Sequence, residues 1–297
     1  MTVGEALRDA ARRLEATSDT ARLDAELLMA HTLGTTRSDM LLRRMNDAEP
    51  AGFAALIDRR MRHEPVAYIT GRQEFYGIEL EVSRAVLIPR SDSETLIEAS
   101  RDAFAGRTPH RILDLGTGSG ALLLAALSIW PQAEGIGLDS SSESLAIAKR
   151  NAQRIGSEAK TAAGLERRFL RRDWKEHGWQ AGLGRFDLIL ANPPYVEDDA
   201  DIASSVREWE PASALFAGPE GLDAYRILIP QLTDLLEPRG LAVLEVGATQ
   251  ARAVADIAME AGFGLQIVTD LGNRPRALIL ANKGLANTGG LATSSAG

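Results

Sequence analysis

The sequence predicts an α/β fold, a mostly parallel sheet covered by helices on both faces and preceded by a small helical bundle. Three observations lead to this fold class. Apolar residues recur at helical spacing through the first 75 residues, whereas strands and helices alternate from Ser91 onward. A glycine-rich turn joins an early strand to the helix after it, and ligands bind at such turns, at the carboxyl ends of parallel strands.

Residues 1–75 are predicted to form an N-terminal helical domain. Thr2 and Glu5 have the spacing of a capping box at the start of the first helix, and apolar residues follow at intervals of three and four. Gly34 marks the end of a second helix, since glycine adopts the left-handed conformation that often closes one. The region is therefore predicted to form a small helical bundle.

Residues 76–90 are predicted to form a hairpin-like connector, because apolar and acidic residues alternate over 78–82. Residues 91–283 then form the α/β domain, in which Ser91 and Glu94 are spaced to cap the first helix. The elements that follow are strands at 111–115, 135–139, 186–190 and 241–246, helices near 121–130, 141–154 and 221–236, and a final helix with two strands.

Composition narrows the possible functions. The net charge of −8 disfavours a protein that attracts nucleic acid through a basic surface. The chain has no cysteine for a disulfide or thiolate zinc site, and its four histidines show no metal-binding spacing, so we expect no metal. No apolar run is long enough to span a bilayer, so we expect a cytoplasmic protein. The small, polar residues 284–297 are expected to form a disordered tail.

A candidate cofactor site lies at the turn after the strand at 111–115. The turn and the acid before it comprise Asp114, Gly116, Thr117, Gly118, Ser119 and Gly120. Glycines let backbone N–H groups approach a ligand, and these also fit a G-x-G-x-x-A dinucleotide pattern that ends at Ala121. Asp139 ends the next strand, 19 residues after Gly120, where a ribose-binding acid is expected. Nicotinamide cofactors and S-adenosylmethionine both fit this turn.

Two features favour S-adenosylmethionine. Asp114 puts negative charge where the sulfonium and ammonium groups of the methionine moiety can use it, whereas a pyrophosphate would be repelled. Asp173 and Trp174 follow a short apolar pair, where a carboxylate could accept from the exocyclic amine of adenine and a ring could stack on the base. Taken alone, Trp174 fits a core or surface aromatic equally well.

The sharpest pattern is a two-proline motif that directly follows the strand at 186–190. It consists of Asn192, Pro193, Pro194 and Tyr195. An isolated turn of this kind merely ends a strand, but the glycine turn upstream favours a catalytic role. The Asn192 side-chain oxygen and the Pro193 carbonyl can accept both N–H bonds of a planar amide or amine, on which Tyr195 can stack. We therefore predict that the motif aims the nitrogen lone pair at a methyl group and stabilises the growing charge.

The combined motifs resemble the amino-methyltransferases of the class I fold that carry N-P-P-Y, and within them the release-factor glutamine methyltransferases. The resemblance covers nearly all of residues 1–285. Its more specific matches are EPVAYITGRQEFYGIELEV at 64–82, VLIPR at 86–90 and GPEGLDAYR at 218–226. It implies a Rossmann-like, seven-stranded sheet. It also implies that S-adenosylmethionine is bound by Gly116–Gly120, Asp139, Trp174 and Asn192.

The resemblance further implies a substrate. Asn192 to Tyr195 would hold the glutamine that class 1 peptide chain release factors present in a Gly-Gly-Gln loop, and the N-terminal domain would help grip that partner. The expected activity is methylation of the glutamine N5 nitrogen by a monomer. One departure is visible, since the family continues Ile-Pro-Arg with Pro-Glu-Thr-Glu, whereas this chain has Ser91, Asp92, Ser93 and Glu94. We expect the serine at the first position to keep a helix-capping role.

Several alternatives remain at this stage. The same chemistry could act on a glutamine of a ribosomal protein or on an exocyclic amine of DNA or RNA. A nicotinamide-dependent oxidoreductase would use the glycine turn but would leave Asn192–Tyr195 without a role. A noncatalytic binding protein would not need this motif intact. Arg90 and Glu94 fit a structural ion pair as well as a cofactor contact.

Overall fold

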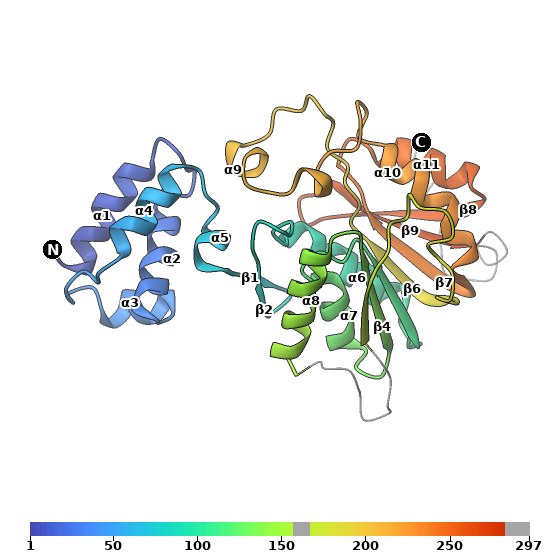
Figure 1. Ribbon diagram of the computed structural model, residues 1–297, viewed down its shortest axis with the longest axis horizontal. Helices are drawn as coiled ribbons and strands as arrows, with labels where there is room; N and C mark the ends of the chain where they lie inside the picture. The colour runs from blue at the N-terminus through green and yellow to red at the C-terminus, as the bar shows by residue number, and fades with distance from the viewer. Residues whose placement is uncertain (157–166, 283–297) are drawn as a thin grey trace. The chain divides into compact units, whose positions relative to one another are not determined.

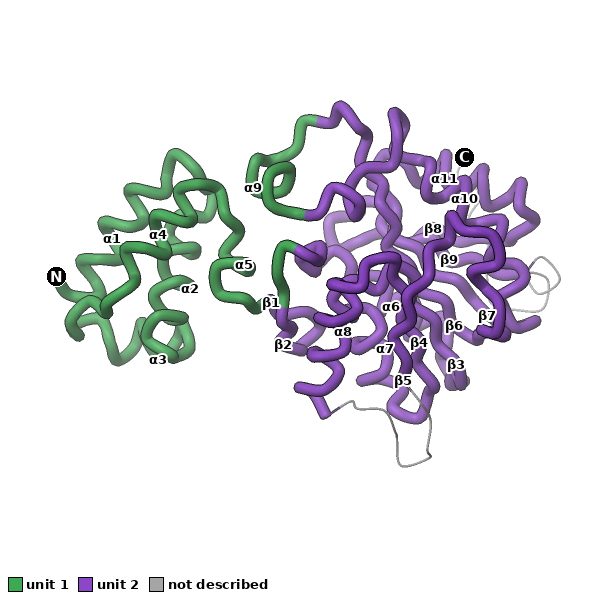
Figure 2. Tube along the Cα trace, viewed as in Figure 1, with its two compact units in different colours: residues 1–72, 82–84, 201–210 green, residues 73–81, 85–200, 211–297 purple. Residues whose placement is uncertain are grey.

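The structure is a computed structural model that describes residues 1–156 and 167–282, so the expected tail at 284–297 lies outside the described residues. The chain divides into two compact units, each with its own core (Figure 2). Unit 1 comprises Met1–Arg72, Val82–Arg84 and Asp201–Glu210, and unit 2 comprises Gln73–Glu81, Ala85–Ala200 and Pro211–Gly297. No helix within the described ranges is both long and apolar enough to cross a membrane.

Unit 1 is helical, as predicted. Its helices are α1 (Val3–Leu14), α2 (Ala21–Leu33), α3 (Arg37–Arg43), α4 (Phe53–Met61), α5 (Val66–Thr70) and α9 (Ser204–Arg207). The predicted capping box is present, because the Thr2 N–H donates to Glu5 at 2.8 Å and the Glu5 N–H donates to the Thr2 hydroxyl at 3.2 Å. Gly34 ends α2 in the left-handed conformation, with φ of 63°.

A buried ion pair lies within the core of unit 1. The Arg60 side chain donates through Nε to the Asp24 carboxylate at 2.7 Å, and the two side chains are only 11% and 8% exposed. The hydroxyls of Ser18 and Thr20 donate to the same carboxylate at 2.7 and 3.0 Å. Because Asp24 is satisfied by three donors, the pair is a specific link between α2 and α4.

The segment Asp201–Glu210 belongs to unit 1 although it is distant in sequence from the helical bundle. Its Trp209 indole donates to the Arg62 carbonyl at 3.2 Å, and the Arg84 guanidinium lies 4.7 Å from the centroid of the Trp209 ring. Arg84 also donates to the Glu208 carbonyl at 3.1 Å. A cation–π contact and two hydrogen bonds therefore attach this segment to unit 1.

Unit 2 is built on the sheet that the sequence predicts (Figure 1). Its strands are β3 (Arg111–Leu115), β4 (Glu134–Asp139), β5 (Arg167–Arg171), β6 (Phe186–Ala191), β7 (Leu236–Glu245), β8 (Phe263–Thr269) and β9 (Pro275–Asn282). In the described part of the chain these seven strands run in the order β5-β4-β3-β6-β7-β9-β8. β9 runs antiparallel to both β7 and β8 and the other pairings are parallel, which confirms the mostly parallel sheet.

Helices cover both faces of this sheet. The helices of unit 2 are α6 (Glu94–Ala103), α7 (Ala121–Ile129), α8 (Ser142–Arg154), α10 (Asp223–Leu228) and α11 (Ala251–Glu260). On β3, Ile112 packs into the core formed with α6, α7 and α8, whereas Leu113 and Leu115 pack into the core with α10 and α11. Alternate residues of a central strand therefore fill opposite cores, which explains why Ile112, Leu113 and Leu115 are all apolar.

A hairpin of β1 (Arg72–Phe75) and β2 (Ile78–Glu81) precedes this sheet. Its two-residue turn has positive φ angles at both positions, 51° at Tyr76 and 74° at Gly77. The Tyr76 N–H donates to Glu94 Oε1 at 3.0 Å, so the first residue of α6 supports the strained position of the turn.

Two local predictions about helices are wrong. The helix expected at 221–236 is instead α10 followed by a 3-10 helix, η3 (Ile229–Asp234), because Pro230 lacks the N–H that a continuing α-helix needs. Ser91 and Glu94 do not cap a helix, since Ser91–Ser93 form the 3-10 turn η1 and α6 has no side-chain cap. Glu94 accepts from Tyr76 instead.

The buried pair in unit 1 generates a stability prediction. Asp24→Asn keeps the shape of the side chain but leaves the buried Arg60 charge uncompensated, so the free energy of unfolding should fall by about 3 kcal/mol. Asp9→Asn is the matched control, because the Asp9–Arg12 pair is exposed and is worth at most about 1 kcal/mol. Urea unfolding followed by circular dichroism measures both. Equal losses in the two variants would show that the buried pair contributes no more to the free energy of unfolding than the exposed pair does.

Candidate active site

The predicted site residues lie at one edge of the sheet, where neighbouring parallel strands end. Leu115 of β3 is in register with Leu138 of β4 and with Ala191 of β6, and Ala191 is in register with Leu244 of β7. Adjacent strands lie about 4.8 Å apart. Gly116 directly follows β3 and Asn192 directly follows β6, so both residues lie at the same edge of the sheet.

The glycine turn after β3 has a backbone that only glycine adopts readily. Gly116, Gly118 and Gly120 have φ angles of 72°, 55° and 86°. A side chain at Gly116 would also press on the Trp174 ring, 3.1 Å from the position of its Cβ. The Thr117 N–H donates to the Leu138 carbonyl at 2.8 Å, which fixes the turn against β4.

A buried asparagine supports the same turn from α8. Asn151 donates through Nδ2 to the Ser119 carbonyl at 2.9 Å and to the Glu81 carbonyl at 3.0 Å, and it accepts from the Glu81 N–H at 2.6 Å. One side chain thus links the glycine turn to β2. Asn151 was not singled out from the sequence, where an asparagine in a helix has no distinctive pattern.

Asp114 is fully buried beneath the glycine turn. The Thr117 hydroxyl donates to its Oδ2 at 2.6 Å. Burial raises the pKa of Asp114 to about 7, although the Thr117 hydrogen bond opposes this shift. The carboxyl group is therefore close to half ionised at neutral pH, and a cation beside it would favour the ionised form.

Asp139, at the end of β4, holds two stretches of backbone. Its Oδ2 accepts from the Gly118 N–H and its Oδ1 from the Ser141 N–H, both at 2.9 Å. Burial raises the pKa of Asp139, whereas these backbone donors oppose the shift. Each carboxylate oxygen has a second acceptor position. The residue therefore anchors the glycine turn and can still accept from a ligand.

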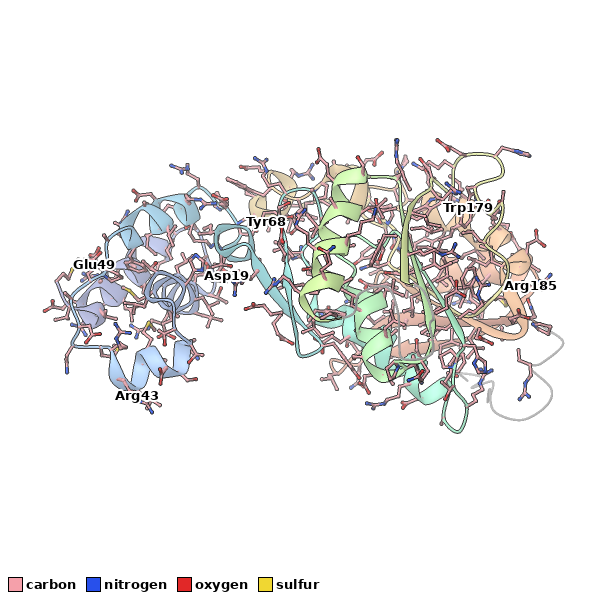
Figure 3. All side chains as sticks on the ribbon, turned by 60° about the horizontal axis from the view of Figure 1, so that its bottom comes forward. Asp19, Arg43, Glu49, Tyr68, Trp179 and Arg185 are labelled. Atoms are coloured by element: carbon pink, nitrogen blue, oxygen red, sulfur yellow. The ribbon has the colours of Figure 1, made fainter. Side chains whose placement is uncertain are left out.

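Trp174 lies against the glycine turn, three residues after β5 ends. Its indole Nε1 is buried without a hydrogen-bond partner among the described residues. Its carbonyl accepts from Gln231 at 3.2 Å, and Gln231 accepts from the indole of the buried Trp179, labelled in Figure 3, at 2.5 Å. The neighbouring Asp173 accepts from the Lys175 N–H at 2.9 Å.

The Asn192–Tyr195 turn directly follows β6, as predicted. Asn192 donates through Nδ2 to the Ser93 hydroxyl in a long contact of 3.4 Å. Pro193 is buried, while Pro194 and Tyr195 are half-buried. Gln250 donates to the Tyr195 carbonyl at 2.9 Å and so holds the end of the turn.

Glu245, the last residue of β7, was not selected from the sequence. It is fully buried, and its oxygens accept from the Ser93 hydroxyl at 2.5 Å and from the Tyr195 hydroxyl at 3.2 Å. Arg276 Nη1 lies 4.0 Å from Oε1. A single acidic residue within the apolar run LAVLEV was the signal that could have identified it.

The segment that departs from the expected Pro-Glu-Thr-Glu pattern is part of this cluster. Asp92 forms ion pairs with Arg276 at 3.0 Å and with Arg274 at 3.5 Å. Ser93 contacts both Asn192 and Glu245. The segment is therefore attached to β7 and β9 by the side chains of Asp92 and Ser93, and Ser91, which was expected to cap a helix, makes no such cap.

Comparison with known proteins covers both parts of the chain. Residues 5–71 match the family model described as PrmC N-terminal domain, and residues 109–246 match the one described as Methyltransferase domain. A release factor glutamine methyltransferase of Caulobacter vibrioides is 36% identical over 277 residues, 90% of this chain and 92% of the relative. Those of Moorella thermoacetica and Rhodospirillum rubrum are 38% and 39% identical, covering 94% of this chain and 98% and 85% of theirs. The chain belongs to the release factor glutamine methyltransferase family.

Proposed function

We propose that this chain transfers a methyl group from S-adenosylmethionine to the N5 nitrogen of the glutamine in the Gly-Gly-Gln motif of class 1 peptide chain release factors. One observation carries the proposal: in a member of this family, the Asn192–Tyr195 turn lies at the sheet edge beside the glycine turn. The enzyme would act as a cytoplasmic monomer and modulate translation termination.

The glycine turn has the features that S-adenosylmethionine requires. Asp114 offers a carboxylate for the ammonium group, and Asp139 keeps acceptor positions for the ribose hydroxyls. Backbone at Gly116, Thr117, Gly118, Ser119 and Gly120 lines the approach, with no Cβ at the three glycines. For the adenine, Trp174 provides a ring and a buried N–H that has no partner in the described part of the chain, and Asp173 provides an acceptor. When bound, the cofactor supplies a methyl group on a sulfonium.

The motif turn would orient the glutamine amide. The Asn192 side-chain oxygen and the Pro193 carbonyl accept its two N–H bonds, which fixes the amide plane and directs the nitrogen lone pair. As the nitrogen gains positive charge during transfer, these acceptors stabilise it more strongly than in the ground state. Pro194 restricts the backbone so that both acceptors keep their positions.

Tyr195 contributes its ring rather than its proton. Burial and the neighbouring Glu245 carboxylate raise the pKa of Tyr195, so its hydroxyl stays protonated at physiological pH. The hydroxyl donates to Glu245, which holds the ring beside the turn. A protonated, anchored tyrosine can stack on the planar amide, and no general base is needed because the product nitrogen can lose its proton to water.

Transfer of labelled methyl from S-adenosylmethionine to purified release factor tests the proposal. We expect label on the Gly-Gly-Gln glutamine, located by peptide mass mapping, and none on a release factor in which that glutamine is changed. Label on both factors, or on neither, would contradict the assigned substrate. Ribosomal proteins and nucleic acids, offered in parallel, would then identify the acceptor.

Asn192→Ala should reduce kcat about 100-fold, because it removes an acceptor that acts most strongly in the transition state. Affinity for S-adenosylhomocysteine, measured by calorimetry, should change by less than about threefold, since the product ligand lacks the transferred methyl. Methyl-transfer kinetics on release factor provide kcat. Turnover that survives the substitution would remove Asn192 from the mechanism.

Cofactor affinity should rise with pH. Asp114, with a pKa of about 7, is mostly neutral at pH 6 and mostly ionised at pH 7.5, and only the ionised form pairs with the ligand ammonium. Binding of S-adenosylhomocysteine should therefore strengthen roughly eightfold over this range, below the pH at which the ligand amine itself titrates. Asp114→Asn should bind more weakly at pH 7.5 and lose most of the slope. A variant with the unaltered slope would assign the titration to another group.

A further inference from the structure

Glu245, at the end of β7, accepts hydrogen bonds through both its side chain and its main chain. Both of its carboxylate oxygens accept from hydroxyls that belong to the candidate site, Ser93 Oγ at 2.5 Å and the Tyr195 hydroxyl at 3.2 Å. Its backbone carbonyl accepts from the Tyr225 hydroxyl at 2.8 Å. Apart from anchoring the Tyr195 ring, the reaction proposed above assigns no role to the Glu245 side chain.

Hydrogen-bond donors and a cation face the Glu245 carboxyl group. Burial raises the pKa of this group, and the Ser93 hydroxyl, Arg276 and the Tyr195 hydroxyl only partly oppose the rise. Arg276 is 10% exposed and in turn pairs with Asp92 at 3.0 Å. In its ionised form the carboxylate therefore has two hydroxyl donors in place of water and a buried guanidinium 4.0 Å away, which it shares with Asp92.

An ionised carboxylate fixes the direction of the hydrogen bonds next to it. Because Glu245 can only accept, the Ser93 hydroxyl must give its proton to Oε2. The lone pairs of Ser93 Oγ are then available to accept, and Asn192 Nδ2 faces them at 3.4 Å. The chain of donors therefore runs in one direction, from Asn192 through Ser93 to Glu245.

This direction determines which end of the Asn192 amide faces the substrate. With Nδ2 on Ser93, the planar group places its oxygen on the opposite side. Rotation of the amide by half a turn would present an NH2 group to the NH2 group of a glutamine, two donors with no acceptor between them. The proposed reaction needs the oxygen in that position, and the Asn192 side chain alone does not choose between the two orientations.

We propose that Glu245 is a positioning residue that, through Ser93, holds the Asn192 amide with its oxygen toward the substrate and, through the Tyr195 hydroxyl, fixes the tyrosine ring. This role rests on the proposed methyl transfer. Glu245 touches neither substrate nor cofactor in it. It acts by being a pure acceptor at the end of the hydrogen-bond chain.

Glu245→Gln tests the role with almost no change in shape. The new amide NH2 can donate to the Ser93 hydroxyl. Ser93 can then donate its own proton to the Asn192 oxygen, which would reverse the orientation of the Asn192 amide. We expect kcat for release factor methylation to fall at least tenfold while the affinity for S-adenosylhomocysteine stays within threefold. A kcat within twofold of the unmodified enzyme would overturn the proposal.

Three further substitutions separate positioning from stability. Tyr225→Phe removes a buried hydrogen bond to the Glu245 backbone but leaves the side-chain network in place, so it should lower the melting temperature without the loss of kcat. Ser93→Ala should lose turnover as Glu245→Gln does, and Ser93→Thr, which keeps the hydroxyl, should recover most of it. Equal effects of Tyr225→Phe and Glu245→Gln on kcat would contradict a positioning role.

A measurement without turnover keeps this proposal separate from the proposed function. The side-chain NH2 signal of Asn192, recorded with 15N-asparagine and identified by its absence in Asn192→Ala, should move in Glu245→Gln and Ser93→Ala but far less in Ser93→Thr. An unmoved signal in Glu245→Gln refutes the positioning role even in an active enzyme. If the unmodified enzyme fails to methylate release factor, the proposed function fails, and the NH2 signal alone decides the role of Glu245.

Discussion

The site depends on the register of four parallel strands, β3, β4, β6 and β7, which end side by side at one edge of the sheet. Register pairs β3 with β4 and β6, and β6 with β7, so that Leu115, Leu138, Ala191 and Leu244 lie in one row across the sheet. Asp114, Asp139, Asn192 and Glu245 each lie within a few residues of that row. The hydrogen bonds of the sheet thus set distances that no loop could hold alone, and the loops supply only the final directions.

This arrangement explains how much could be predicted from sequence. Strands buried on both faces appear as apolar runs, so the glycine turn and the two-proline turn could be placed at strand ends before their neighbours were known. Asp114 and Asp139 could be selected for the same reason, because each closes or nearly closes such a run. The local sequence pattern is sufficient to predict a site residue when the position of that residue is set by the strand on which it lies.

The remaining contacts depend on partners that are distant in sequence. Ser93 and Glu245 are 152 positions apart and meet only because η1 lies against the end of β7. The local spacing of this segment predicted a helix cap at Ser91, but it carried no information about the distant partner of Ser93. The bond from Asn151 to Ser119 depends equally on how α8 packs. Such side chains have an ordinary local pattern, and their partners are fixed by strand order and helix packing rather than by periodicity.

Two buried carboxylates at the sheet edge differ in what balances their charge. Asp114 has one hydroxyl donor and no cation in the described structure beside it, so its pKa rises to about 7. Burial also raises the pKa of Glu245, but this residue has two hydroxyl donors and the buried Arg276 beside it, so a counter-charge is part of the fold. A carboxylate without a built-in cation responds to a ligand that brings one, whereas a compensated carboxylate keeps its hydrogen bonds whether or not the ligand is present. The first is suited to recognising a cationic cofactor, and the second to keeping the Asn192–Tyr195 turn in one orientation before substrate arrives.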